Sequence, residues 1–199
     1  MDFKGKVALI TGGGNGIGRA VALAFAQLGA KVVVVDRDAK AAEGTAGSIR
    51  QRGGDALAVT ADVTRSAEVQ AYVKATLDKY GRIDCFFNNA GIEGQVAHID
   101  IYDEAVFDQV ISVNVKGVFL GMRYVLPAML KQGSGAIVNT ASVAAYGIAG
   151  HVGLRCLQTC GHRADQDGRD RSVVQRRPCQ RNMSRPGGHT DDPLPRIPG

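Results

Sequence analysis

Three glycines near the start of the chain have the spacing of a phosphate-binding turn. Gly12, Gly16 and Gly18 follow a short apolar run, and glycine lets the backbone turn tightly and approach a ligand closely. A helix expected to begin near Ile17 would direct free N–H groups and the positive end of its dipole at the same space. Together with Asn15 in the turn, these residues predict a site for a pyrophosphate group.

An acidic residue follows the turn at the distance expected for a dinucleotide site. It supplies the second part of the predicted site. Asp36 ends a predicted strand, where a carboxylate accepts hydrogen bonds from an adenosine ribose and repels a 2′-phosphate. We therefore expect NAD as the cofactor, with NADP less favoured, although Arg37 directly after Asp36 weakens this preference. A glycine-rich turn alone could be purely structural, and the acid in register with it favours the dinucleotide site.

The turn lies inside a predicted strand–turn–helix–strand unit. Residues 7–10 form the apolar run of a buried strand, and apolar residues recur at helical spacing over residues 20–28. Gly29 closes the helical pattern, and residues 31–35 are a β-branched run typical of a second strand. The unit therefore predicts the order β-α-β around the turn.

Strands and helices alternate beyond this unit. We expect strands at residues 56–60, 83–87 and 136–140, and helices at residues 41–52, 66–80 and 106–130. The first of these helices is weak because Gly44 and Gly47 interrupt it, and Pro127 should bend or stop the last. Residues 93–108 have the pattern of a loop that could shape a substrate pocket. The alternation predicts an α/β fold, a doubly wound parallel sheet (Rossmann fold) with right-handed crossovers.

Small and polar residues follow two of the predicted strands. Asp62 and Val63 follow the strand at residues 56–60, where a carboxylate can reach the adenine amino group. Asn89, Ala90 and Gly91 follow the next strand. Because ligands of open α/β sheets bind at the carboxyl ends of the strands, these three are predicted to line the nicotinamide ribose.

The composition of the chain fits one globular α/β domain. Its 199 residues are 45% hydrophobic, which suffices for a core. It has no run of eighteen apolar residues and no basic-then-apolar leader. We therefore expect neither a membrane span nor secretion, and predict a cytoplasmic protein.

Composition changes after residue 153. Residues 154–199 hold nine Arg and five Asp but no Lys or Glu, and they carry most of the net charge of +5. The same segment holds three of the four Cys and five of the six Pro, without Phe, Tyr or Trp. Such a break indicates a different origin or disorder more than a second domain. We expect a nucleotide-binding domain at residues 1–153 and an aberrant, disordered tail at residues 154–199.

The motifs of residues 1–153 resemble those of the short-chain dehydrogenase/reductase family. The resemblance rests on TGGGNGIG at residues 11–18, Asp36, Asp62-Val63, NNAG at residues 88–91, Asn114 within SVNVKGVF and Ser142 within IVNTASVA. It implies a nicotinamide-binding fold, hydride transfer between the cofactor and a secondary alcohol or ketone, and a homo-oligomer. It also implies catalytic roles for Ser142, whose hydroxyl would bond the substrate oxygen, and for Asn114, whose backbone would support a proton relay.

The tyrosine–lysine pair of that family is missing where the resemblance requires it. The pattern Y-x-x-x-K, with its tyrosine thirteen residues after Ser142, falls on Arg155 and Thr159. Arginine does not release a proton near neutral pH, and threonine has no charge with which to lower a neighbour's pKa. Tyr146 has Gly150 four residues later and is interpreted as a packing residue. We therefore expect the chain to be catalytically impaired.

A shifted reading frame accounts for the missing pair. If residues 154–159 are encoded by CTA CGC TGC CTC CAA ACA, reading from the second base gives Y-A-A-S-K. The same frame permits H-A-V-I-G-L-T-K-T-A-A over residues 159–169 and V-N-A-I-C-P-G over residues 179–185, which match the family in order. We interpret the tail as the product of one nucleotide gained, or two lost, near codon 153, in the gene or in its sequencing. Loss of two would restore the family's spacing.

Two other functional classes stay open. A non-catalytic nucleotide-binding protein would keep the glycine turn and bind NAD without chemistry. The arginines of the tail could bind nucleic acid, but the segment has no aromatic residue for base stacking. Its Cys and His match no zinc spacing, so we predict no metal site. We expect a small alcohol or ketone as partner, and neither nucleic acid nor membrane; the change after residue 153 puts the homo-oligomer in doubt.

Overall fold

A five-stranded parallel sheet forms the centre of the molecule. The computed structural model describes residues 2–141, and residues 1 and 142–199 lie outside it. The strands run in the order β3-β2-β1-β4-β5, with bounds β1 Val7–Thr11, β2 Lys31–Asp36, β3 Ala56–Thr60, β4 Cys85–Asn88 and β5 Ala136–Asn139. The order reverses between β1 and β4, which confirms the predicted doubly wound sheet. Ligands of such sheets bind at this reversal.

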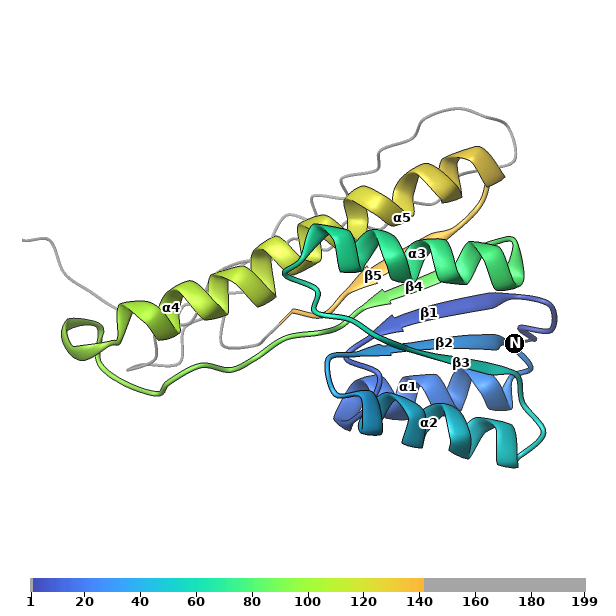
Figure 1. Cartoon of the computed structure of the whole chain (residues 1–199), viewed down its shortest axis with the longest axis horizontal. Coiled ribbons are helices and arrows are strands. Elements are labelled where there is room, and N and C mark those ends of the chain that lie inside the picture. Colours follow the sequence, from blue (N-terminus) through green and yellow to red (C-terminus); the bar gives the residue numbers. More distant parts are fainter. Residues whose placement is uncertain (1, 142–199) are drawn as a thin grey trace, which may run out of the picture.

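Helices cover both faces of the sheet (Figure 1). α1 Gly16–Gln27 and α2 Ala39–Gln51 lie on one face, and α3 Ser66–Tyr80 and α5 Val118–Gln132 lie on the other. α4 Glu104–Ile111 precedes α5 and extends past the carboxyl ends of the strands, joined to it by the π-helical turn η2 Ser112–Gly117. A short 3₁₀ helix, η1 Ile99–Ile101, precedes α4. The cleft at the carboxyl ends is therefore bordered by the β1–α1 turn and by α4.

The sheet separates two apolar cores. Alternate residues of β1 point to opposite faces, so Val7 and Leu9 pack under α3 and α5, whereas Ala8 and Ile10 pack under α1 and α2. All four are buried. Burial on both faces explains why β1 and β2 are continuous apolar runs rather than alternating ones.

The expected interruption of α2 by its glycines and a stop of α5 at its proline are not found. α2 continues through Gly44, whose surroundings are open, because Asp38 caps its first turn by accepting from the Lys40 amide at 2.9 Å. α5 continues past Pro127 and ends at Gly133, which has a left-handed φ of 70°. Packing of these helices on the sheet outweighs the low helix propensity of single residues.

The boundaries of two other elements differ from the expectation. β4 begins at Cys85, two residues later than predicted. The stretch 93–108, expected to be a loop, contains η1 and the start of α4, which Asp103 caps. Asp103 accepts from the Ala105 amide at 2.7 Å, a capping signal that the sequence already held.

The run from α4 through α5 is one continuous helix of 29 residues, Glu104–Gln132. By length and composition alone it could cross a membrane, a test that core helices of globular proteins also pass. Here α5 packs against β4 and α3, with Val118, Val125 and Met129 buried. We therefore assign it to the helical layer of the sheet.

Candidate functional site

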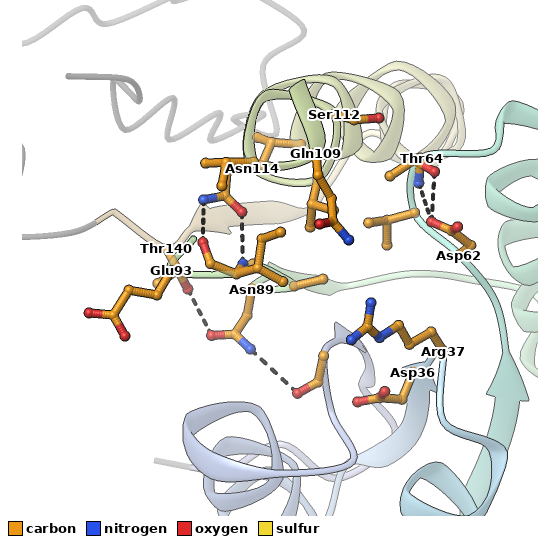
Figure 2. A pocket seen from close by; sticks show the side chains of 18 of the residues that line it. Asp36, Arg37, Asp62, Thr64, Asn89, Glu93, Gln109, Ser112, Asn114 and Thr140 are labelled. Atoms are coloured by element: carbon orange, nitrogen blue, oxygen red, sulfur yellow. Dashed lines mark hydrogen bonds between the residues drawn. The ribbon is translucent and has the colours of Figure 1, made fainter. Parts of the chain in front are cut away.

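An open cleft of about 990 Å³ lies at the carboxyl ends of the strands. Figure 2 shows its side chains converging from the ends of β2, β3 and β4 and from the helix above them. The cleft brings together all but one of the described residues predicted for the cofactor: Gly12, Asn15, Gly16, Ile17, Asp36, Arg37, Asp62, Val63, Asn89, Ala90, Gly91 and Asn114.

The glycine turn requires glycine at two of these positions. Gly12 has a φ of +64° and Gly16 a φ of +50°, both in the left-handed region. A Cβ on Gly12 would also lie 3.0 Å from the Cα of Ala90. The turn therefore packs backbone against backbone with the loop that follows β4.

Gly18 is the predicted residue that does not line the cleft. It is buried in α1, and a Cβ there would lie 2.1 Å from the carbonyl oxygen of Gly12. Its lack of a side chain lets α1 pack directly against the turn. In this structure Gly18 therefore shapes the site from beneath and has no surface in it.

The first turn of α1 faces the cleft without a side-chain cap. Asn15 is the N-cap residue, and its side chain makes no capping hydrogen bond. By contrast, Asp38 caps α2 and Asp103 caps α4. Because the first amides of a helix have no intrahelical acceptor, those of α1 remain available to an anion.

Asp36 is anchored at the end of β2 by backbone amides. Its Oδ2 accepts from the Gly14 amide at 2.9 Å and its Oδ1 from the Asp38 amide at 3.1 Å. Each carboxylate oxygen has a second lone pair, so the group can still accept bonds from a ligand. Arg37 lines the cleft beside it, as Figure 2 shows, and is the one Lys or Arg among the described lining residues.

Asp62 holds a negative charge in the loop after β3. Its Oδ1 accepts from the amide and the hydroxyl of Thr64 at 2.9 and 2.8 Å. Burial favours the protonated form, but these bonds and the charges of Arg65 and Arg37 outweigh it and hold the pKa of Asp62 below its usual value. Asp62 is therefore ionised at neutral pH and accepts hydrogen bonds.

The loop after β4 is tied to its neighbours through Asn89. The Asn89 side chain donates to the carbonyl of Thr11 at 3.2 Å and accepts from the Thr140 hydroxyl at 3.0 Å. The Thr11 hydroxyl in turn accepts from the amides of Asn89 and Ala90 at 3.0 and 3.2 Å. Asn89 thus joins β1 to the end of β5, and its side chain is committed to the protein.

Asn114 clamps the same loop from above. Its side chain makes two bonds to Ile92, accepting from the amide at 2.9 Å and donating to the carbonyl at 2.8 Å (Figure 2). Asn114 belongs to the π-helical turn η2, and such turns occur frequently at functional sites. The side chain is thereby occupied, so only the backbone of Asn114 remains for the proton relay that the sequence predicts.

Several site residues escaped the sequence reasoning. Thr11 and Thr140 lie inside the motifs TGGGNGIG and IVNTASVA but were given no role, and Thr64 lies in neither; each bonds to a predicted neighbour. Residues 93–108 were expected as a loop that could shape a substrate pocket, without named side chains; the cleft is lined there by Glu93, Gln95, Val96, Tyr102, Phe107 and Asp108, and next to them by Gln109. These side chains mix apolar and polar groups, as a substrate pocket does.

Not all of the expected acid–base residues belong to the part of the chain that the structure describes. Ser142 lies outside the described residues. Tyr102 is the one tyrosine lining the described cleft, and its hydroxyl accepts from the Gln95 amide at 3.2 Å. No lysine lines the part of the cleft formed by residues 2–141. Within that same range no cluster of three His, Cys, Asp or Glu could hold a metal ion.

Comparison with known proteins gives a consistent set of matches. Residues 6–153 match the short chain dehydrogenase family. Levodione reductase from Leifsonia aquatica is 49% identical over 143 residues, and cyclohexanol dehydrogenase from Acinetobacter sp. strain SE19 is 43% identical over 142 residues. The solved structure of an NAD⁺-bound xylitol dehydrogenase superposes with a TM-score of 0.74 at 36% identity.

These matches stop short of the full length on both sides. The two sequence relatives are matched over 71% of this chain and over 54% and 57% of their own lengths. The xylitol dehydrogenase is matched over 76% of this chain and 58% of its own. The chain thus spans little more than half the length of the relatives it matches, and the family match ends at residue 153.

Proposed function

The chain belongs to the short chain dehydrogenase family, and from this premise we propose that it is the NAD-binding part of an oxidoreductase of secondary alcohols or ketones. The observation that carries the proposal is the arrangement at the sheet reversal. The glycine turn, the uncapped start of α1 and the carboxylate of Asp36 line one cleft there. Each offers what one part of a dinucleotide needs.

The residues present fit NAD group by group. The α1 amides and Gly12 would hold the pyrophosphate, and Asp36 would accept from the adenosine ribose. Asp62 would accept from the adenine amino group, and Ala90 and Gly91 would line the nicotinamide ribose. Asp36 favours NAD over NADP because it would repel a 2′-phosphate, with Arg37 beside it as the one opposing charge.

The nicotinamide, when bound, supplies or accepts a hydride. The chain's own part in proton transfer would come from Asn114 and Ser142. A π-helical turn takes backbone carbonyls out of the regular ladder, which supports a role for the Asn114 backbone in a proton relay. The Ser142 hydroxyl would bond the substrate oxygen. No tyrosine–lysine pair follows at the family's spacing, so we expect negligible turnover.

We further propose that residues 1–153 are the nucleotide-binding domain and that residues 154–199 arise from a shifted reading frame. The end of the family match at residue 153 supports this boundary. A cytoplasmic location, and the absence of nucleic-acid and membrane partners, remain predictions. The homo-oligomer expected from the family would depend on the segment that the frame replaces.

One experiment tests the cofactor and the frame separately. The present chain should bind NAD in calorimetry and show no NADH absorbance change with cyclohexanol, the alcohol named for one relative. A gene restored to the other frame after codon 153 should gain turnover of about 10²- to 10⁴-fold, the usual contribution of general acid–base catalysis. A restored gene with phenylalanine in place of the recovered tyrosine is the matched control.

Each result has one meaning. Absence of NAD binding by both chains contradicts the cofactor assignment. DNA across codon 153 that encodes no Y-x-x-x-K in any frame contradicts the frame assignment, and with NAD binding retained it favours the second candidate, a nucleotide-binding protein without catalysis. The missing tyrosine–lysine pair is the observation that keeps this second candidate.

A further inference from the structure

Thr45 is a fully buried hydroxyl residue in an otherwise apolar helix face. It lies on α2 with Ala42, Ala46 and Ile49, all buried against the sheet. Its hydroxyl donates across to the carbonyl oxygen of Gly14 at 3.1 Å, 31 residues away in sequence. Buried threonines in helices commonly bond the carbonyl four residues earlier in the same helix. Thr45 instead joins α2 to the glycine turn.

Thr76 provides the contrast within the same molecule. It is equally buried, on α3, and its hydroxyl donates to the carbonyl of Tyr72 in its own helix at 2.7 Å. The two threonines therefore differ in the partner of the hydroxyl and not in burial. The Thr76 hydroxyl bonds within its own helix, whereas the Thr45 hydroxyl joins α2 to the glycine turn.

Gly14 is held through both of the peptide groups that flank its Cα. Its amide donates to Asp36 Oδ2 at 2.9 Å while its carbonyl accepts from Thr45. Gly14 is buried, and a Cβ there would lie 2.7 Å from the Cβ of Ala41, so the turn is pressed against α2. The backbone of Gly14 thus connects Thr45 to the carboxylate that faces the cleft.

No residue of α2, Ala39–Gln51, lines the described cleft. An effect of α2 on a ligand must therefore pass through the turn or through the end of β2. Without the Thr45 hydroxyl, the buried Gly14 carbonyl would lack its partner, which is unfavourable unless the Gly14–Asn15 peptide turns away. Because the two peptide groups on either side of Gly14 share its Cα, a rotation that turns the carbonyl away also shifts the backbone that carries the amide, and this loosens the hold on the Asp36 carboxylate.

We propose that Thr45 is a positioning residue for cofactor selection, acting through Gly14 to fix both the glycine turn and the direction of the Asp36 carboxylate. The proposal rests on the proposed function, because it takes NAD as the ligand of this cleft. It extends that function to a helix that does not touch the ligand, and it makes the choice between NAD and NADP depend on a hydroxyl group.

The test compares three variants of the full chain by calorimetry with NAD and with NADP. Thr45→Val keeps the branched shape and removes the hydroxyl, and should weaken NAD binding about tenfold, the equivalent of one lost hydrogen bond. NADP binding should weaken less, so that the ratio of the two dissociation constants moves toward one. Thr45→Ser keeps the hydroxyl and should restore that ratio. Thr76→Val removes an equally buried hydroxyl and should leave the ratio unchanged.

General destabilisation of the fold weakens the binding of NAD and of NADP alike and does not change the ratio of their dissociation constants. This ratio is therefore the informative quantity. If the ratio of the NAD and NADP dissociation constants is the same in Thr45→Val and Thr76→Val, the proposal is overturned and the proposed function stays intact. Failure of the unaltered chain to bind NAD would overturn both.

Hydrogen exchange on the unaltered chain gives a second test that does not depend on how Thr45→Val folds. Addition of NAD should slow amide exchange in α2 as well as in the glycine turn, although α2 does not line the cleft. The carboxyl-terminal half of α5 is the internal reference and should not respond. Slowed exchange in the turn without any change in α2 would contradict a positioning role for Thr45.

Discussion

The two ends of the parallel strands carry aspartates in opposite circumstances. At the carboxyl end, Asp36 and Asp62 are partly exposed and line the cleft; Asp36 accepts from backbone amides, and Asp62 accepts from Thr64 and lies 3.8 Å from the exposed Arg65 guanidinium. At the amino end, Asp84 is 7% exposed and is paired with Arg82 at 2.6 Å and with Lys6 at 3.3 Å. Within residues 2–141 Asp36 has no ion pair and Asp62 has only an exposed one, whereas the buried charge of Asp84 is neutralised by two cations.

The amino end is built to hold strands together. Asp84 Oδ2 accepts from the Val7 amide at 2.9 Å, which ties β4 to the start of β1. The Gln132 side chain accepts from the Ile83 amide at 3.1 Å and donates to the Ile83 carbonyl at 3.0 Å, which ties α5 to the same place. The groups that pair with a carboxylate therefore distinguish a structural aspartate from one that is available to a ligand. Variants at the amino end should alter stability, and variants at the cleft should alter cofactor affinity.

The largest effect on stability is expected where the backbone of α1 packs directly against the glycine turn. Gly18→Ala would place a Cβ 2.1 Å from the Gly12 carbonyl oxygen. Overpacking of this kind should lower the free energy of unfolding by roughly 3 kcal/mol or more, measured by urea denaturation. It is the one cleft change expected to alter stability strongly.

Gly44→Ala is the matched control for that variant. Gly44 is exposed in α2, and a Cβ there would meet no atom within 4 Å. The substitution should raise stability by about 0.5–1 kcal/mol, since alanine loses less backbone entropy in a helix. Equal losses from both substitutions would show that the short Gly18 contact is not the cause.

At the amino end, Asp84→Asn should lower stability by about 1–3 kcal/mol at neutral pH while leaving NAD affinity unchanged. Burial works against the charged form, but the bonds from Arg82, Val7 and Lys6 prevail and hold the pKa of Asp84 below its usual value. Its contribution is therefore complete above the ordinary aspartate pKa of about 3.9 and is lost as pH falls through the lower folded value.

Urea denaturation of both chains across this acid range checks the assignment. The stability difference between wild type and Asp84→Asn should shrink as the pH falls below about 4. Asp62 also has a lowered pKa, but it is present in both chains and cancels in the difference. A difference that stays constant down to low pH, or a change in NAD affinity, would break the proposed division between the two ends.

At the carboxyl end, Asp36→Asn should show the reverse pattern. It keeps an oxygen for the Gly14 amide but loses the charge, so NAD should bind about tenfold more weakly and discrimination against NADP should fall. Asp38→Asn, two residues away, is the control, because Asp38 does not line the cleft and asparagine also caps helices. Calorimetry with both cofactors separates the two variants; similar losses would mean that local charge alone matters.

The smallest effect is expected between the two ends, in the core. Tyr72 is fully buried, and its hydroxyl has no hydrogen-bond partner among the described residues. Tyr72→Phe should leave NAD affinity unchanged and raise stability by up to about 1 kcal/mol, because an unsatisfied buried hydroxyl is removed. A loss of stability in thermal denaturation would reveal a partner for this hydroxyl.

Much of the fold was predictable because its signals are local. The turn, α1 and β2 follow from glycine spacing, helical periodicity and a β-branched run within residues 7–36. The bounds of α3 were predicted to the residue, since its amphipathic pattern ends at Gly81, a left-handed C-cap. Predictions failed at Gly44 and Pro127, where packing on the sheet overrides the preference of a single residue.

The site shows the same division between local signals and tertiary packing. The sequence by itself determined which residues reach the cleft, because a strand that ends in a turn must present its next residues at the carboxyl edge of the sheet. Only the tertiary structure decided how they are held: the bond from Thr45 to Gly14, the clamp of Asn114 on Ile92 and the π-helical turn. The two hydrogen bonds join residues that are 31 and 22 positions apart in the chain, so they exist only once the helices have packed on the sheet.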